Sequence, residues 1–256
     1  LTIDEGEFVA IIGQSGSGKS TFMNIITGKL MPDEGKVEWA KNVRVGYLDQ
    51  HAVLEKGMTI QSVLASAFDF LYDMENQMNE IYAGLGDASP EEMDKLMAEA
   101  GTIQDLLTMH DFYMIDAKVE EVARALGLSE LGLDKDVTEL SGGQRTKVLL
   151  GKLLLEKPDI LLLDEPFSAL DYQTRLEVSD DIGSIIKEQK KTALLVTHDI
   201  SEAISMGDQV VILSQRPATI KKIIDIHFSI PDRTPFTSRQ APEFAGYFND
   251  IWEEIQ

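Results

Sequence analysis

Hydrophobic residues in this chain gather into a few short, unbroken runs, each ending in polar residues or glycine. Short apolar runs without alternation are typical of strands that are buried on both faces of a parallel sheet. We therefore predict strands at residues 8–12, 159–164, 192–197 and 209–213. Residues 224–230 instead place an apolar side chain at every second position, which predicts a half-exposed strand.

A long region between these runs carries apolar residues at helical spacing. We predict one helix at residues 60–81 and a second beginning at Pro90, separated by a break at Gly84-Leu-Gly86. Ser89-Pro-Glu-Glu92 is a capping box with proline at the first helical position. Two helices joined by a short turn form an antiparallel hairpin. A third helix is predicted at about 116–126, closed by a glycine.

Methionines recur on the apolar faces of the predicted hairpin, among them Met74, Met78, Met93 and Met97. A methionine stripe can serve as a docking surface, or it can fill the space between two packed helices. We expect packing between the helices. Residues 69–139 also contain 18 acidic and four basic side chains, which we expect to form solvated helix faces.

The first predicted strand leads directly into Gly13-Gln-Ser-Gly-Ser-Gly-Lys-Ser20, and residues 21–28 follow as a predicted helix. The loop matches the phosphate-binding pattern G-x-x-x-x-G-K-[ST] at every fixed position. Its glycines let backbone N–H groups point at phosphate oxygens, and the helix N-terminus adds positive charge. A flexible Gly/Ser turn is the alternative, but strand, loop and helix occur in the required order. The predicted nucleotide-binding residues are Gly13, Ser15, Gly16, Ser17, Gly18, Lys19, Ser20 and Thr21.

A second predicted strand ends in Asp164 and Glu165. Acids at the carboxyl end of a parallel strand face the crevice where ligands bind in open α/β sheets. We predict that Asp164 and the Ser20 hydroxyl hold Mg²⁺, and that Glu165 orients or deprotonates the attacking water. An ordinary strand-end turn is the alternative interpretation of the acidic pair, and the nearby phosphate loop disfavours it.

Two further features complete the candidate chemistry. Leu140-Ser-Gly-Gly-Gln144 precedes a predicted helix at residues 145–155, so its backbone N–H groups would form a second anion site. His198 follows the strand predicted at 192–197, where an imidazole could bond the γ-phosphate. The remaining histidines lack such a context, and we expect them to be structural or on the surface: His51, His110 and His227.

Taken in order, these motifs resemble those of the ATP-binding cassette (ABC) superfamily over nearly the whole chain. That family carries six motifs, and all six are present: the phosphate loop, Gln50, the signature at residues 140–144, Asp164-Glu165, Ser168-Ala-Leu-Asp171 and His198. The resemblance implies an α/β P-loop NTPase fold with a mostly parallel central sheet flanked by helices. It also implies an α-helical subdomain, here with an inserted helical hairpin.

The resemblance also implies roles for single residues. ATP and Mg²⁺ are the implied cofactors; Ser20, Gln50 and Asp164 would serve the metal, and Glu165, His198 and Gln50 would be catalytic. The signature residues Ser141, Gly142, Gly143 and Gln144 would act on the ATP of a second copy, in a head-to-tail homodimer. Asp171 would couple the two sites across that dimer.

One ABC ATPase domain is expected to occupy residues 1–256. Within it we expect a nucleotide-binding core at 1–58 and 157–230 and a helical subdomain at 59–156. The acidic hairpin would lie at 60–110, and residues 231–256 would form an appendage carrying prolines and aromatic residues.

The two halves of the chain resemble different classes. Residues 28–165 resemble the ABC-F class of ribosome-associated factors, on Val45-Gly-Tyr-Leu-Asp-Gln50 and the hairpin. Residues 166–256 resemble the ATPases of nitrate, sulfonate and taurine importers. We interpret the chain as a mosaic, recombined or engineered as a chimera, with seams near 24–29 and 165–167; a divergent natural protein is the alternative. A transporter motor, an ABC-F fragment and a chimera without a cellular partner all remain open.

Family members usually carry further strands before the phosphate-loop strand, with an aromatic residue that stacks on adenine. This chain opens at Leu1, shortly before that strand. The resemblance therefore implies a loss of about 1–3 kcal/mol of stacking, by analogy with other base–aromatic contacts. Impaired hydrolysis is the expected consequence.

Charge and composition bear on the compartment and the partners. The net charge is −21 and the chain has no cysteine, so disulfides and thiolate metal sites are excluded. No apolar run approaches the roughly 18 residues that cross a bilayer. We expect a cytoplasmic protein, at a membrane only through a membrane-domain partner. The charge disfavours nucleic acid or a ribosome as a partner without eliminating it.

Overall fold

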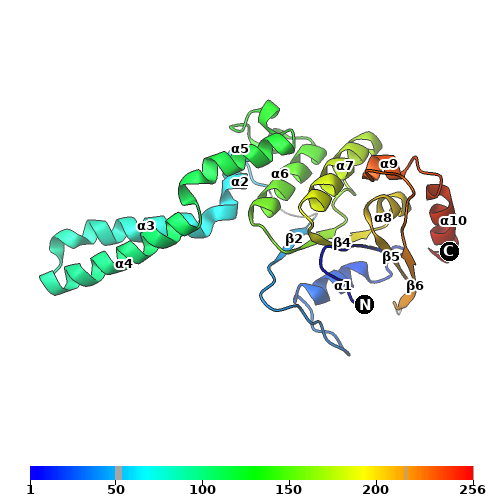
Figure 1. The fold of residues 1–256 in the computed structure, drawn as a ribbon, viewed down its shortest axis with the longest axis horizontal. Coiled ribbons are helices and arrows are strands. Elements are labelled where there is room, and N and C mark those ends of the chain that lie inside the picture. The colour runs from blue at the N-terminus through cyan, green and yellow to red at the C-terminus, as the bar shows by residue number, and fades with distance from the viewer. Residues whose placement is uncertain (50–53, 217, 256) are drawn as a thin grey trace.

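A six-stranded sheet forms the centre of the structure, a computed structural model that describes residues 1–49, 54–216 and 218–255. In spatial order β2-β3-β4-β1-β5-β6, five strands run parallel, and β6 is antiparallel to its neighbour β5. The strands are β1 (Phe8–Ile12), β2 (Val45–Asp49), β3 (Ile160–Asp164), β4 (Thr192–Thr197), β5 (Gln209–Leu213) and β6 (Ile220–Asp225). The predicted mostly parallel sheet is confirmed (Figure 1).

The apolar runs at 8–12, 192–197 and 209–213 form strands with the predicted bounds, and the run at 159–164 starts one residue later than predicted. Strand β2 was not predicted, because Gly46 interrupts its apolar pattern. A Cβ at Gly46 would lie 2.8 Å from Cγ of Pro158, so close packing from outside the sheet explains the glycine.

The last strand, β6, spans residues 220–225 rather than the predicted 224–230. Beyond β6, backbone N–H groups donate hydrogen bonds to side chains of the C-terminal segment. The His227 N–H donates to Oη of Tyr247 at 3.0 Å, and the Ser229 N–H donates to Glu243 at 3.0 Å. The alternation at 224–230 thus marks a strand only at its start, and afterwards a segment that packs on the tail.

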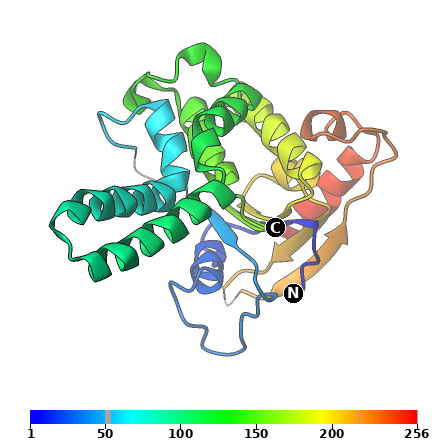
Figure 2. The same ribbon diagram turned by 60° about the vertical axis from the view of Figure 1, so that its left-hand side comes forward.

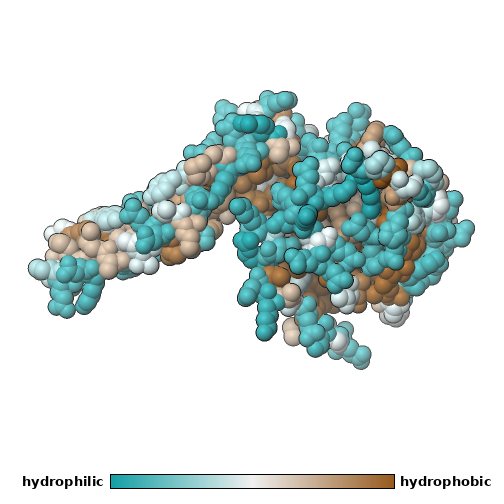
Figure 3. All heavy atoms as spheres, in the orientation of Figure 1, coloured by the Kyte–Doolittle hydropathy of each residue, from teal (hydrophilic) through white to brown (hydrophobic). Residues whose placement is uncertain are grey.

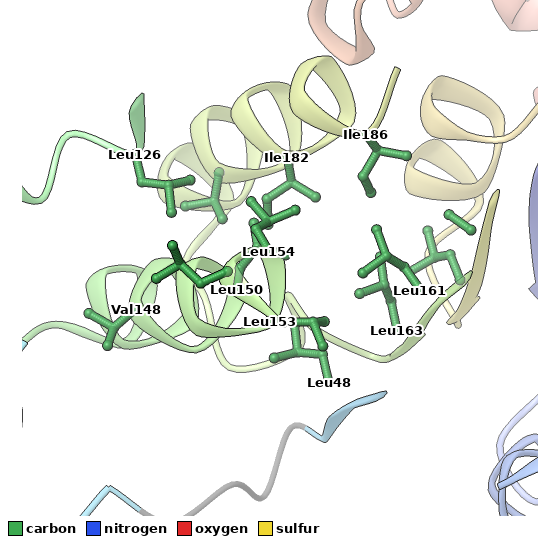
Figure 4. Packing of buried hydrophobic residues seen from close by; sticks show 14 of the residues in the cluster. Leu48, Leu126, Val148, Leu150, Leu153, Leu154, Leu161, Leu163, Ile182 and Ile186 are labelled. Carbon is green, nitrogen blue, oxygen red and sulfur yellow. The ribbon is translucent and has the colours of Figure 1, made fainter. Parts of the chain in front are cut away.

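Helices cover both faces of the sheet. Helix α1 (Lys19–Ile26) lies on one face, where Met23 packs with alternate residues of the central strands. The opposite face is covered by α6 (Gly142–Leu155), α7 (Tyr172–Glu188) and α8 (Ile200–Met206). Leucines of α6 and β3 pack there with isoleucines of α7 (Figure 4).

A helical arm extends away from the sheet (Figures 1 and 2). The arm consists of α3 (Asp69–Gly84) and α4 (Pro90–Met109), whereas α2 (Ile60–Ala65) and α5 (Ile115–Ala125) pack on α6 at its base. Helices α3 and α4 pack side by side, as predicted for a hairpin. The capping box of Ser89 and Glu92 is present at the start of α4, and α5 follows the predicted third helix closely.

The predicted continuous helix at 60–81 is wrong in one respect, because a 3-10 turn at Ser66–Phe68 divides it. The Ser66 hydroxyl donates to the Val63 carbonyl at 2.6 Å, a local bond that competes with regular helical bonding. Ala67 and Phe68 are buried in the turn. The turn lets α2 pack on α6 while α3 leaves the body to meet α4.

The methionines of the arm differ in burial: some pack between the helices, and others are exposed. Met74 and Met78 are partly buried against the core, as expected for packing. Met93 and Met97 are exposed, so the packing prediction is wrong for these two. The cause is position, because α4 is buried only from Ala100 onward. Figure 3 shows hydrophilic and weakly hydrophobic residues mixed along the visible face of the arm.

The C-terminal segment folds against the sheet region as α9 (Pro235–Ser238) and α10 (Phe244–Ile255). Helix α10 contacts α8 and β5.

Within the described part of the chain, no helix is both long and apolar enough to span a bilayer.

Candidate functional site

The predicted phosphate loop connects β1 to α1, in the arrangement that its sequence requires. Gly16 and Gly18 have φ values of 80° and 102°, a left-handed conformation that favours glycine. A Cβ on Gly13 would lie 2.7 Å from Oγ of Ser17, so that glycine allows the loop to close on itself. Gly18 directly precedes the first helical residue, so the positive end of α1 faces the loop.

Lys19 lies inside this loop and is buried. Its ammonium group donates to the carbonyl oxygens of Gly13 at 2.8 Å and Gln14 at 3.2 Å. Burial lowers the pKa of Lys19, and the nearby carboxylates of Glu165 and Asp164 oppose that shift. The ammonium group of Lys19 is thus held within the loop by two backbone carbonyl groups.

Glu165 and His198 meet at the carboxyl ends of β3 and β4. Nδ1 of His198 lies 3.3 Å from Oε2 of Glu165. Glu165 has a φ of 45°, which is strained for a non-glycine residue, and its N–H donates to the Val196 carbonyl at 2.8 Å. Strain of this kind concentrates at functional sites, where the surrounding structure holds it.

Asp164 is the last residue of β3 and is partly buried. Oη of Tyr47 lies 3.4 Å from its carboxylate. The oxygens of Asp164 and the exposed Ser20 hydroxyl are donors that suit Mg²⁺, which prefers a few protein oxygens together with substrate phosphates. The third residue predicted for the metal, Gln50, lies outside the described residues.

A cavity of about 880 Å³ brings most of these groups together. Its wall contains seven of the eight predicted phosphate-loop residues, together with Glu165 and His198. Ser17 is the exception, because its side chain is buried beneath the loop and its N–H donates to the Gln14 carbonyl at 3.1 Å. The site therefore combines an anion-binding loop, a carboxylate and an imidazole around one space.

Part of the cavity wall was missed by sequence reasoning. Phe248, Trp252 and Ile255 of α10 line it, as does Arg216 from the turn after β5. The rings of Phe248 and Trp252 are stacked, with centroids 6.3 Å apart and planes at 10°. The tail predicted as an appendage thus forms one side of the site. Its aromatic content was visible in the sequence, but nothing there indicated which surface it covers.

The signature residues lie elsewhere, at the start of α6. Ser141 is the N-cap residue, and its hydroxyl accepts the Gln144 N–H at 3.3 Å while the Gln144 side chain accepts the Ser141 N–H at 3.0 Å. Ser141 and Gly142 are exposed. Among the described residues that line the cavity, none belongs to the signature.

Asp171 also caps a helix. Its carboxylate accepts bonds from the Thr174 N–H at 3.1 Å and the Thr174 hydroxyl at 2.6 Å at the start of α7. The side-chain bond from Thr174 is the main cause that lowers the pKa of Asp171. Close packing joins α6 to α7, because a Cβ on Gly143 would overlap Cγ2 of Thr174.

The fold and site define a P-loop NTPase domain. The model of the ABC transporter family matches residues 1–168, and the chain belongs to that family of ATP-binding domains. The ATPase class predicted from the motifs is therefore confirmed.

Three relatives show the range of proteins that the chain resembles. It is 62% identical over 196 residues to YfmM of Bacillus subtilis, an uncharacterised ABC transporter ATP-binding protein. The aligned region covers 77% of this chain and 37% of YfmM. It is 32% identical to the nitrate import ATP-binding protein NrtD of Synechococcus elongatus, covering 90% of this chain and 74% of NrtD. It is 32% identical to the energy-dependent translational throttle protein EttA of Escherichia coli K12, covering 78% of this chain and 35% of EttA. The chain thus spans well under half the length of YfmM and EttA.

A solved structure supports the same assignment. A dimeric ATP-binding cassette in a post-hydrolysis state, bound to ADP and Pi, is similar with a TM-score of 0.57 and 26% identity. The similarity covers 89% of this chain and 88% of that one.

Proposed function

We propose that this chain binds Mg-ATP in the cavity around the phosphate loop and hydrolyses it to ADP and phosphate. The observation that carries the proposal is the convergence of Lys19, Glu165 and His198 on one space beside the N-terminus of α1. Nucleotide phosphates require a fixed positive charge and backbone donors, and the loop offers both.

Each of these groups has a distinct role in the proposed reaction. Lys19 moves its ammonium group from the two loop carbonyls to the phosphates, where a charge-assisted bond is stronger. Glu165 accepts a proton from the attacking water. His198, which lies beside Glu165, donates to the γ-phosphate. Ser20 and Asp164 would hold Mg²⁺, which supplies charge neutralisation of the phosphates when bound.

Hydrolysis is proposed to need a head-to-tail pair of copies. The exposed residues Ser141 and Gly142 lie at the N-terminus of α6, which is absent from the wall of their own cavity, as far as the described residues show. A second copy can present this signature to the phosphates instead. The similar cassette structure is a dimer with ADP and Pi, which supports this arrangement.

Two cellular settings are supported by different parts of the chain. Similarity to NrtD over 90% of the chain supports a transporter motor, in which a membrane-domain partner would use the ATPase. The projecting α3–α4 arm and the similarity to EttA support a ribosome-associated fragment instead. Sedimentation of the chain with purified ribosomes distinguishes them, because the motor proposal predicts no association.

Phosphate release by the purified chain tests the proposed activity. Glu165→Gln keeps the shape of the side chain but removes its basicity, so we expect turnover to fall by about 10²-fold while ATP binding is retained. Absence of Mg-ATP-dependent phosphate release by the wild type would refute hydrolysis. Equal turnover in the variant would show that Glu165 is only a strand-end acid.

A further inference from the structure

A buried ion-pair network lies behind the candidate catalytic residues. Arg175, in the second turn of α7, is 19% exposed. Its Nη2 donates to the Leu170 carbonyl at 3.1 Å, and its Nη1 donates to Oδ2 of Asp199 at 3.1 Å. Its Nε lies 3.5 Å from Oε1 of Glu202. One guanidinium group therefore joins the loop at 167–171 to the start of α8.

The same network holds both neighbours of His198. The Thr197 hydroxyl donates to Oε2 of Glu202 at 2.5 Å and accepts the Asp199 N–H at 3.0 Å. The other oxygen of Asp199 caps the first turn of α8. The network therefore holds the backbone on both sides of His198.

The network is sensitive to loss of its cation. Glu202 is 3% exposed, and burial raises the pKa of its carboxyl against the lowering effect of the Thr197 hydrogen bond and of Arg175. Removing Arg175 leaves this buried acid without its cationic partner, which is strongly unfavourable. Lysine is a poor replacement, because an ammonium group cannot match three partners in the fixed geometry of a guanidinium group.

We propose that Arg175 is a positioning residue that couples the loop carrying Asp171 to the placement of His198 beside Glu165. The proposal rests on the proposed function. Asp171 is the N-cap of α7, and the Arg175 N–H donates to its carbonyl oxygen at 2.9 Å, so a partner copy that displaces Asp171 also moves the guanidinium group. That movement reaches Asp199 and so the backbone of His198.

Kinetics of Arg175→Gln test this coupling. We expect turnover at saturating Mg-ATP to fall by at least about tenfold, since small displacements of catalytic groups have large effects on rate. The Kd for Mg-ATP should change less than about twofold, because Arg175 does not line the cavity. Arg175→Lys should recover only part of the rate.

Arg233→Gln is the matched control. Arg233 is also largely buried, pairs with Asp208 at 3.1 Å and donates to the backbone carbonyls of Ile204 and Gly207. We expect Arg233→Gln to lower the stability of the fold. It should not lower turnover selectively while leaving the Kd for Mg-ATP unchanged. An equal loss of turnover in the two variants would overturn the proposal.

Two measurements identify His198 as the target. In a His198→Ala background, Arg175→Gln should cause little further loss of turnover; an undiminished further loss would contradict the proposal. Without nucleotide, Arg175→Gln should shift the imidazole NMR resonances of His198, and Arg233→Gln should leave them in place. Resonances unmoved by Arg175→Gln, or moved equally by both variants, would overturn the proposal.

If the wild type binds Mg-ATP without hydrolysing it, the proposed function fails, and the resonances of His198 alone decide the role of Arg175.

Discussion

The side-chain amide of Gln14 donates a 2.6 Å hydrogen bond to the main-chain carbonyl of Ile255, which joins the phosphate loop to the last turn of α10. Gln14 also accepts a bond from Gln215 at 3.1 Å. The loop is thus held from outside by two segments that follow β5 in the sequence. We therefore expect nucleotide binding to change the environment of the C-terminal helix, α10.

Trp252 provides a direct readout of that coupling, because it is half exposed and lines the cavity. The chain has two tryptophans, and Trp39→Phe leaves Trp252 as the only tryptophan, whose emission can be excited selectively. We predict that Mg-ATP changes the fluorescence of this variant as the local polarity changes. The matched variant Trp252→Phe should show no such change. A response carried by Trp39 alone would contradict the placement of α10 at the site.

The contact between α6 and α7 gives a second prediction. Gly143→Ala should destabilise the fold by about 1–3 kcal/mol, because the new methyl group meets Cγ2 of Thr174. Thr174→Ser removes that methyl group and keeps the hydroxyl, so the double variant should recover most of the loss. Gly101→Ala is the control: it has open space and should stabilise α4 by about 0.5–1 kcal/mol. Denaturant unfolding measures all three; a neutral Gly143→Ala would contradict the close approach.

The strands and the phosphate loop could be predicted from sequence because their patterns are local. An apolar run at 8–12 and the spacing of Gly13, Gly18 and Lys19 contain the information for β1, the loop and the start of α1. The division of the helix at Ser66–Phe68 could not be predicted, because it arises from packing of α2 on α6 while α3 packs on α4.

The parts of the site that could not be predicted from sequence also depend on tertiary contacts. Arg175 joins Leu170, Asp199 and Glu202 across two helices, and only the cap formed by Asp199 has a local sequence pattern. The tail was assigned to no surface because its contact with Gln14 spans nearly the whole chain. The mosaic origin and the boundaries of the proposed subdomains stay predictions.

Assembly is tested by blocking the signature. Ser141→Arg places a long side chain over the exposed N-terminus of α6, so we predict that it abolishes the Mg-ATP-dependent dimer while each copy still binds ATP. Thr102→Arg adds the same charge on the exposed face of α4 and should leave the dimer intact.

Sedimentation in the Glu165→Gln background, where ATP persists, measures both variants. Because the net charge of −21 makes copies repel, moderate salt should favour the dimer. If ATP never shifts the parent protein from monomer to dimer, the head-to-tail proposal is wrong.

Calorimetric titration of Mg-ATP into the wild type and Lys19→Ala tests the central claim most directly. Lys19 is the buried cation of the phosphate loop, so its loss should weaken binding by about 1.5–3 kcal/mol, or roughly ten- to two-hundred-fold. Lys41→Ala removes the same charge from an exposed loop and should bind like the wild type. Equal affinity of the wild type and Lys19→Ala, or no binding by the wild type, would contradict the assignment of this cavity to nucleotide.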